Sequence, residues 1–218
     1  MTRRSRLLTT AAAGATAALL LAGCGGGDGD SKAKDKIAGA DTGETASASP
    51  SASASSSSGR PKITFPSGVK NVFEDTKSGD ATKDAVLADS ALSVNSVDEA
   101  IFKGSTSTEA LGFYNAGKAL SSSITYVQGY IDDGDTWVGE TRYFDRKVTL
   151  SGAKEAYVTY CSDESKSFIK VKKTGKVKNT PTTADSYVLY HTTLAQNAAG
   201  VWQTTNVVSN RGAKECQP

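Results

Sequence analysis

Residues that usually build metal and nucleophile sites are scarce in this chain. It contains one histidine, His191, and three cysteines, Cys24, Cys161 and Cys216. It has no CxxC motif, no nucleophile elbow and no glycine-rich phosphate-binding loop. A histidine–cysteine metal site is therefore not indicated, and we predict neither a metal nor another cofactor.

A strong excess of either charge is also missing. The sequence has 25 basic and 23 acidic residues, and three of the basic ones, Arg3, Arg4 and Arg6, precede the first apolar run. Removing these three arginines leaves 22 basic against 23 acidic residues. A nearly neutral remainder offers no electrostatic footprint for nucleic acid, so we predict no such partner.

Long hydrophobic runs are absent beyond residue 22. The first run, residues 7–22, follows a basic start and is rich in alanine and leucine. Its length of about 16 residues is short for a membrane-spanning helix, which needs roughly 20. A basic start, a short apolar middle and small residues at the exit are typical of an export signal, which we place at residues 1–23.

The exit of this run is Leu21-Ala22-Gly23-Cys24, which resembles the lipobox of bacterial lipoproteins at all four positions. The resemblance implies that Cys24 becomes the first mature residue and carries acyl chains such as palmitate. Two or three acyl chains hold a protein on a membrane where a single one does not. We therefore expect a lipid-anchored protein on the extracytoplasmic face of the cell membrane. The alternative is an ordinary secretory signal with a chance cysteine.

The remaining thiols, Cys161 and Cys216, would then lie in a compartment where disulfides persist. We predict that they form a disulfide, which would stabilise the fold by roughly 4 kcal/mol on the chain-entropy model. A metal pair or two reactive thiols are the alternatives.

Residues 24–61 predict a disordered tether. The segment is rich in glycine, serine, alanine and proline, and Ile37 is its only large aliphatic residue. Such a composition buries too little apolar surface to offset the entropy of chain ordering. Apolar residues return after residue 62, so we predict a single folded domain over residues 62–218.

The first half of this domain has helical periodicity. Leu87, Ala91, Val94 and Ile101 mark one face of a helix within residues 80–103. Residues 106–109 read Thr-Ser-Thr-Glu, a capping-box pattern that predicts the start of a short helix. Residues 120–131 repeat apolar side chains at intervals of four and three, which predicts a third helix.

Beyond Asp135 the period changes to two, as in β-strands. We predict strands over residues 137–150 and 156–161, a hairpin of 167–172 with 176–179, and a second hairpin of 186–195 with 201–209. Helices followed by strands indicate an α+β domain in which helices cover one face of a curved antiparallel sheet.

This order of elements resembles the cone-shaped nuclear-transport-factor-2-like fold. The ending, from Gly200-Val201-Trp202 to Cys216, is similar to the last strand of actinobacterial lipoproteins with such domains. The resemblance covers about residues 80–218 and implies a pocket between the helices and the concave face of the sheet. A cystatin-like or half-barrel α+β layer is the alternative fold.

His191 is the candidate catalytic residue. It lies within the predicted strand 186–195, on the face that also carries Leu189 and Thr193. In the resembled fold some members abstract protons with an Asp or a His, and imidazole titrates near neutral pH. The alternative is a strand residue that points to solvent or packs in the core.

Four lysines, Lys170, Lys172, Lys176 and Lys178, are the candidate binding residues. They flank the turn at residues 173–175, and on a hairpin they could share one face. Such a face could bind anionic cell-wall polymer or lipid headgroups. Alternatively, lysines on an edge hairpin prevent sheet-to-sheet aggregation.

Together these patterns predict a membrane-anchored extracytoplasmic lipoprotein whose domain binds a small amphipathic ligand or an envelope protein, rather than an enzyme. An enzyme of isomerase or dehydratase type that uses the cone pocket is one alternative. A structural spacer without a ligand is the other.

Overall fold

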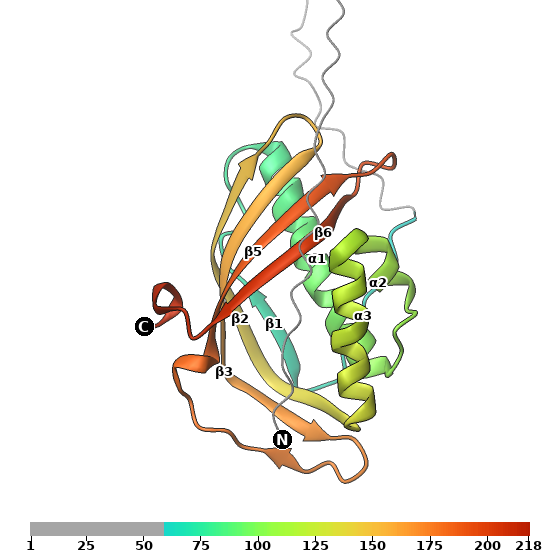
Figure 1. Ribbon diagram of the computed structural model, residues 1–218, viewed down its shortest axis with the longest axis vertical. Helices are drawn as coiled ribbons and strands as arrows, with labels where there is room; N and C mark the ends of the chain where they lie inside the picture. The colour runs from blue at the N-terminus through green and yellow to red at the C-terminus, as the bar shows by residue number, and fades with distance from the viewer. Residues whose placement is uncertain (1–58) are drawn as a thin grey trace, which may run out of the picture. The chain divides into compact units, whose positions relative to one another are not determined.

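The computed structural model describes residues 59–218, and the predictions for the leader, Cys24 and most of the tether lie outside this range. Figure 1 shows helices packed against a strongly curved sheet. The elements follow in the order β1 (Val69–Phe73), α1 (Ala81–Lys103), α2 (Glu109–Tyr114), α3 (Gly117–Asp132), β2 (Asp135–Leu150), β3 (Glu155–Val171), β4 (Val177–Lys178), β5 (Tyr187–Gln196) and β6 (Trp202–Arg211). Short 3-10 turns at Ala184–Ser186 and Lys214–Cys216 complete it.

Helix α1 confirms the periodicity of residues 80–103, and both of its ends are capped. The Asp80 side chain accepts hydrogen bonds from the backbone N–H groups of Thr82 and Lys83. Gly104 ends the helix in the left-handed conformation, and its N–H bonds to the carbonyls of Ala100 and Ile101. These contacts satisfy groups that a helix end leaves without intrahelical partners.

The other two helices are present, but the capping box is wrong. Helix α2 begins at Glu109, directly after Thr108, and no side-chain hydrogen bond caps it. The Thr106–Glu109 pattern therefore precedes the helix instead of opening it. Helix α3 confirms the third periodic segment, and Val127 is its most deeply buried large side chain.

The sheet is mixed rather than purely antiparallel, and its strands follow the spatial order β1-β2-β3-β5-β6. Strand β1 pairs with β2 in parallel, while the other neighbours are antiparallel. The strands predicted at 156–161 and 167–172 are one continuous strand, β3, and the short β4 pairs with its end. Three helices on the concave face of this sheet confirm the α+β class and the cone-shaped arrangement (Figure 1).

Two irregularities in β2 accompany the curvature. The register between β2 and β3 shifts at Glu140/Arg142 and again at Phe144/Lys147. Gly139, beside the first shift, has a φ of 107°, and a Cβ there would lie 2.0 Å from the carbonyl oxygen of Lys166. Bulges bend a strand and increase its twist, so β2 can wrap around α1.

The core is divided between the two ends of α1. Near its start, Val86 and Leu87 pack with Val158, Leu194 and Trp202 of the sheet. Near its end, a second cluster includes Ile101, Leu111, Val127 and Trp137. The middle of α1 therefore lies between two well-packed regions.

The C-terminal segment is held against the outer face of the sheet. Cys161 of β3 and Cys216 form a disulfide with their Cα atoms 5.4 Å apart, as predicted. Ala213, Phe144, Tyr187 and Leu189 pack around this bridge. Among the described residues, no helix is both long enough and apolar enough to span a membrane.

Candidate functional site: a cavity between the helices and the sheet

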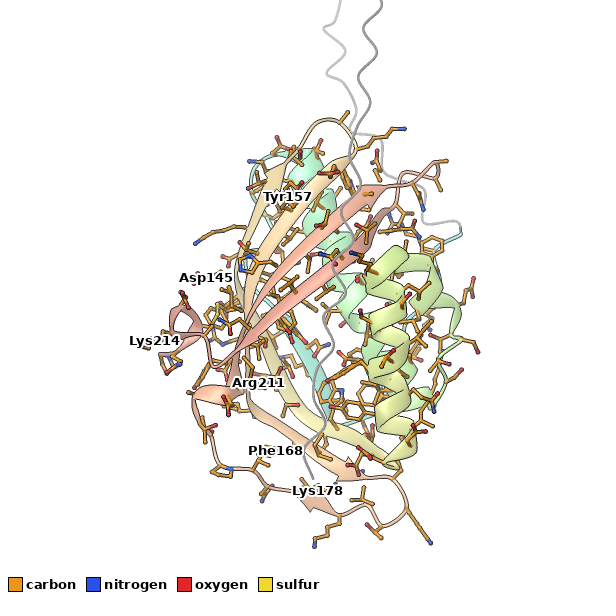
Figure 2. All side chains as sticks on the ribbon, viewed as in Figure 1. Asp145, Tyr157, Phe168, Lys178, Arg211 and Lys214 are labelled. Atoms are coloured by element: carbon orange, nitrogen blue, oxygen red, sulfur yellow. A yellow bond between two sulfur atoms is a disulfide. The ribbon has the colours of Figure 1, made fainter. Side chains whose placement is uncertain are left out.

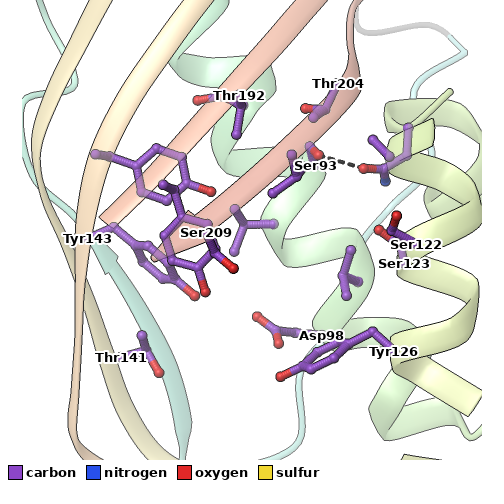
Figure 3. A pocket seen from close by; sticks show the side chains of 18 of the residues that line it. Ser93, Asp98, Ser122, Ser123, Tyr126, Thr141, Tyr143, Thr192, Thr204 and Ser209 are labelled. Carbon is purple, nitrogen blue, oxygen red and sulfur yellow. Dashed lines mark hydrogen bonds between the residues drawn. The ribbon is translucent and has the colours of Figure 1, made fainter. Parts of the chain in front are cut away.

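A cavity of about 420 Å³ lies between α1, α3 and the concave face of the sheet (Figure 3). Its lining combines hydroxyl groups, aromatic rings and a few charges. The lining residues are Ser90, Ser93, Val94, Val97, Asp98, Asn115, Ala119, Ser122, Ser123, Tyr126, Tyr130, Trp137, Thr141, Tyr143, Tyr160, Glu164, Ser167, Tyr190, Thr192, Thr204, Val207, Ser209 and Arg211.

Short side chains on the helices leave this space open. The middle of α1 presents Ser90 and Ser93 to the cavity, and α3 presents Ala119, Ser122 and Ser123. The sheet contributes alternate residues, because successive side chains of a strand point to opposite faces. Small residues on two helices that face a concave sheet therefore produce a hollow rather than a packed core.

Asp98 is the acidic group at the α1 wall of the cavity. One carboxylate oxygen accepts a hydrogen bond from the Asn71 amide at 2.7 Å, and the other accepts from the Trp137 indole at 3.2 Å. Burial raises the pKa of Asp98 to about 7, although both hydrogen bonds oppose this shift. No ion pair joins Asp98 to a cation among the described residues.

Tyrosines form much of the remaining wall. Tyr160 stacks on Tyr190 with ring centroids 4.9 Å apart, and Tyr143 meets Tyr160 edge to face at 6.0 Å. Burial raises the pKa of Tyr143, Tyr160 and Tyr190, and the negative charge of Asp98 adds to each shift. These phenols therefore stay neutral at physiological pH and offer both ring surface and hydroxyl groups.

The cavity opens between α3 and the second half of β6. Lining residues there, including Tyr126, Val207 and Ser209, are exposed to solvent. Beside them the guanidinium of Arg211 donates to Glu164 at 2.8 Å and to the carbonyl oxygen of Asp185 at 2.6 Å. The charge of Glu164 is thus neutralised, whereas that of Asp98 is not.

A buried polar network closes the end of the cavity near α2. The hydroxyl of Ser93 donates to the Asn115 side chain at 2.7 Å, which Figure 3 marks with a dashed line. The Asn115 amide donates in turn to Ser96 at 2.9 Å and to the carbonyl of Leu111 at 3.0 Å. Because every member has a partner, the network fixes α1 against the end of α2.

The candidate base His191 does not reach this cavity. It is exposed on β5, whereas its neighbours Tyr190 and Thr192 line the cavity. Alternation along the strand therefore places the imidazole on the outer face of the sheet. A role for His191 as a general base inside the cone is wrong on this geometry.

The four candidate lysines do not share one face either. Lys170 pairs with Val177 and Ile169 pairs with Lys178, so Lys170 and Lys178 point to opposite sides of the β3–β4 ribbon. Lys172 donates to the carbonyl of Ile101 at 2.8 Å, and Lys178 pairs with Asp135 at 2.7 Å. Figure 2 shows Lys178 in this ribbon, at the end of the sheet opposite Tyr157. Lys176, on the exposed turn, does not restore a continuous basic face.

Asp98 was not among the candidate site residues predicted from the sequence. A signal for it exists: Asp98 continues the apolar row of Leu87, Val94 and Ile101, so an acid occupies a position of the buried helix face. Several tyrosines of the strands also line the hollow.

Comparison with known proteins gives distant structural likenesses only. No family model and no curated protein matches the sequence. The intermembrane-space region of the chloroplast protein ARC6 is 14% identical with a TM-score of 0.38, over 62% of this chain and 99% of that chain. A ketosteroid isomerase-like protein from Erwinia carotovora is 14% identical with a TM-score of 0.37, over 58% of this chain and 93% of that chain. At these scores the likenesses carry no information about activity.

Proposed function

We propose that this domain binds a small amphipathic ligand in the cavity between α1, α3 and the sheet. The observation that carries the proposal is the mixed lining of an open cavity of about 420 Å³. Tyrosine rings offer apolar contact, and hydroxyl and carboxylate groups offer directional hydrogen bonds. Ligand sites in proteins commonly combine a mostly preformed hollow with a few polar groups that fix orientation.

Binding of a neutral, polarity-sensitive dye tests this proposal. We expect the full chain to bind prodan saturably, at one dye per chain, with a blue shift of its emission as it leaves water. The absence of saturable binding would count against the cavity as a ligand site. A small ligand is favoured over an envelope protein or cell-wall polymer, because the cavity is hollow and the lysines form no common face.

We further propose that the domain is held on the extracytoplasmic face of the cell membrane by acyl chains on Cys24. The support is the Leu-Ala-Gly-Cys sequence after a short apolar run, together with a disulfide, a bond that persists outside the cytoplasm.

Replacement of the anchor residue tests this location. The Cys24→Ser variant should move from the membrane fraction to the soluble fraction, since it lacks the sulfur that receives the lipid. Retention of the variant on membranes to the same extent as the parent protein would refute the anchor.

An enzyme of isomerase type is the second candidate, and Asp98 is the observation that favours it. A buried carboxylate with a pKa of about 7 can accept a proton from carbon near neutral pH. Such an enzyme would exchange deuterium from D2O into the α-carbons of a bound ketone, and Asp98→Asn would abolish the exchange. Cyclohexanone followed by NMR is a suitable first probe, and exchange at the buffer rate would speak against this activity.

A further inference from the structure

Asp98 is a half-buried acid that forms no ion pair within residues 59–218, and it lines a cavity open to solvent. Its two carboxylate oxygens together accept two hydrogen bonds, from Asn71 and Trp137. An ionised carboxylate can accept about four. Asp98 therefore retains acceptor capacity that the protein around it does not use.

The surrounding charges leave this acid uncompensated. Glu164 of β3 and Arg211 of β6 pair with each other, and the tyrosines of α3, β2, β3 and β5 that line the cavity are neutral. Buried Arg146 of β2 lies behind Ser90, where it donates to Ser90 and to the carbonyl of Leu87. Ser90 and Asp98 are eight residues apart on α1, roughly 12 Å along the helix.

A second acceptor lies in the same part of the cavity. Figure 3 shows the hydroxyl end of Tyr126, from α3, near the carboxylate of Asp98, whose charge contributes to the raised pKa of Tyr126. Tyr126 and Tyr130 approach each other with hydroxyl oxygens 3.4 Å apart. A carboxylate and a phenol oxygen thus face one region of the cavity, with aromatic rings around it.

We propose that the cavity recognises a protonated primary or secondary amine on an apolar body, with the ammonium group at Asp98 and Tyr126. This inference rests on the proposed function and names its ligand class. An ammonium group supplies both N–H donors and the positive charge that the Asp98 carboxylate lacks. A neutral alcohol supplies a hydrogen bond alone. The tyrosine rings then hold the apolar body.

The matched probes 2-phenylethylamine and 2-phenylethanol separate charge from shape. By isothermal titration calorimetry on the full chain at pH 8, we expect the amine to bind at least about tenfold more tightly than the alcohol. Lowering the pH to 6 should weaken the amine about tenfold and leave the alcohol unchanged, because Asp98 with a pKa of about 7 takes up a proton. Trp137, which donates to Asp98, should report amine binding through its fluorescence.

Two variants identify the groups responsible. Asp98→Asn should abolish the preference for the amine while the alcohol binds within about twofold of its original affinity, and Tyr126→Phe should weaken the amine selectively. The exposed acid Asp133, at the end of α3, provides the control variant Asp133→Asn, which should preserve the preference.

The outcomes separate this inference from the proposed function. Equal affinity of the wild-type protein for the amine and the alcohol would overturn the amine inference and leave a ligand-binding cavity. Binding of prodan without binding of either probe would likewise overturn the amine inference and leave a ligand-binding cavity. Failure of all three compounds to bind would overturn both proposals.

Discussion

Two acids on α1, buried Asp89 and half-buried Asp98, differ in what surrounds them. Asp89 forms an ion pair with Arg60 and accepts a hydrogen bond from the backbone N–H of Trp202 at 2.9 Å. Asp98 accepts hydrogen bonds from two neutral donors, and no cation of residues 59–218 pairs with it. Removing a charge from water costs free energy unless it is paired, so Asp89 belongs to the fold whereas Asp98 is held at an energetic cost.

This cost predicts an unusual pH dependence of stability. Because the folded pKa of Asp98, about 7, lies above the usual 3.8, the folded state holds a proton between these values that the unfolded state has released. The stabilisation that this proton gives to the folded state is complete below pH 3.8 and is lost as the pH rises through about 7. The full shift in the pKa of Asp98 sets an upper bound of about 4 kcal/mol on the resulting change in unfolding free energy.

Asp98→Asn should therefore stabilise the protein at pH 8. The expected gain in unfolding free energy is about 1–2 kcal/mol, below the upper bound because the group faces a solvent-filled cavity and asparagine has one acceptor fewer. Urea denaturation at pH 8 and pH 4 measures the effect.

The gain should vanish at pH 4, where aspartic acid and asparagine are both neutral. If Asp98→Asn instead lowers the unfolding free energy at both pH 8 and pH 4, Asp98 has a structural role. Stability that increases when a buried charge is removed is typical of a residue retained for function.

At the level of single residues, the sequence predicted the disulfide partners but not the residues of the cavity. Cys161 and Cys216 could be paired because the chain offers few thiols, which leaves few choices. The hydrogen bonds of Asp98 to Asn71 of β1 and Trp137 of β2 could not be predicted, because those contacts depend on chain folding over tens of residues. His191 was misplaced because sequence gives the alternation of a strand but not which face meets the helices.

Among the elements, β2 shapes the cone. Its bulges let one strand pair with both β1 and β3 while the sheet bends around α1. Gly139 lets β2 lie very close to β3. Its φ of 107° and the nearby carbonyl oxygen of Lys166 leave no room for a side chain at this position.

Gly139→Ala should therefore destabilise the domain severely. We expect the unfolding free energy to fall by at least about 3 kcal/mol, through backbone strain and a clash that only movement of β3 relieves. Thermal unfolding followed by circular dichroism measures the change.

Gly129 of α3 provides the matched control, because a Cβ there meets nothing within 4 Å. Gly129→Ala should stabilise the protein by up to about 1 kcal/mol, as expected for alanine in a helix. Equal effects of the two substitutions would contradict the role given to Gly139.

Local patterns predicted most elements, and non-local pairing accounts for the errors. Helices α1 and α3 and strands β2, β5 and β6 follow the period of their side chains. The parallel pairing of β1 with β2 joins residues about seventy positions apart, which no local pattern encodes. Strand β3 continues through Ser162–Ser165, where polar residues suggested a break, because β2 and β5 pair with it there.

For the whole molecule, we propose an anchor at Cys24 and a ligand cavity in residues 59–218. The N-terminal part of the described chain is fixed to the domain, because Arg60 binds Asp89 and Thr64 donates to Glu99 at 2.9 Å. The cavity lies apart from these contacts, between α3 and the sheet. We therefore expect ligand binding to be independent of the lipid.

Dye binding by two tryptophan variants of α3 tests the ligand cavity most directly. Ser123 lines the cavity, whereas exposed Ser121 lies outside its lining and serves as the control. We predict that Ser123→Trp weakens prodan binding at least about tenfold, because the indole occupies the hollow, and that Ser121→Trp leaves the affinity within about twofold. Unchanged affinity in a folded Ser123→Trp protein would contradict the account, because the dye would then bind elsewhere.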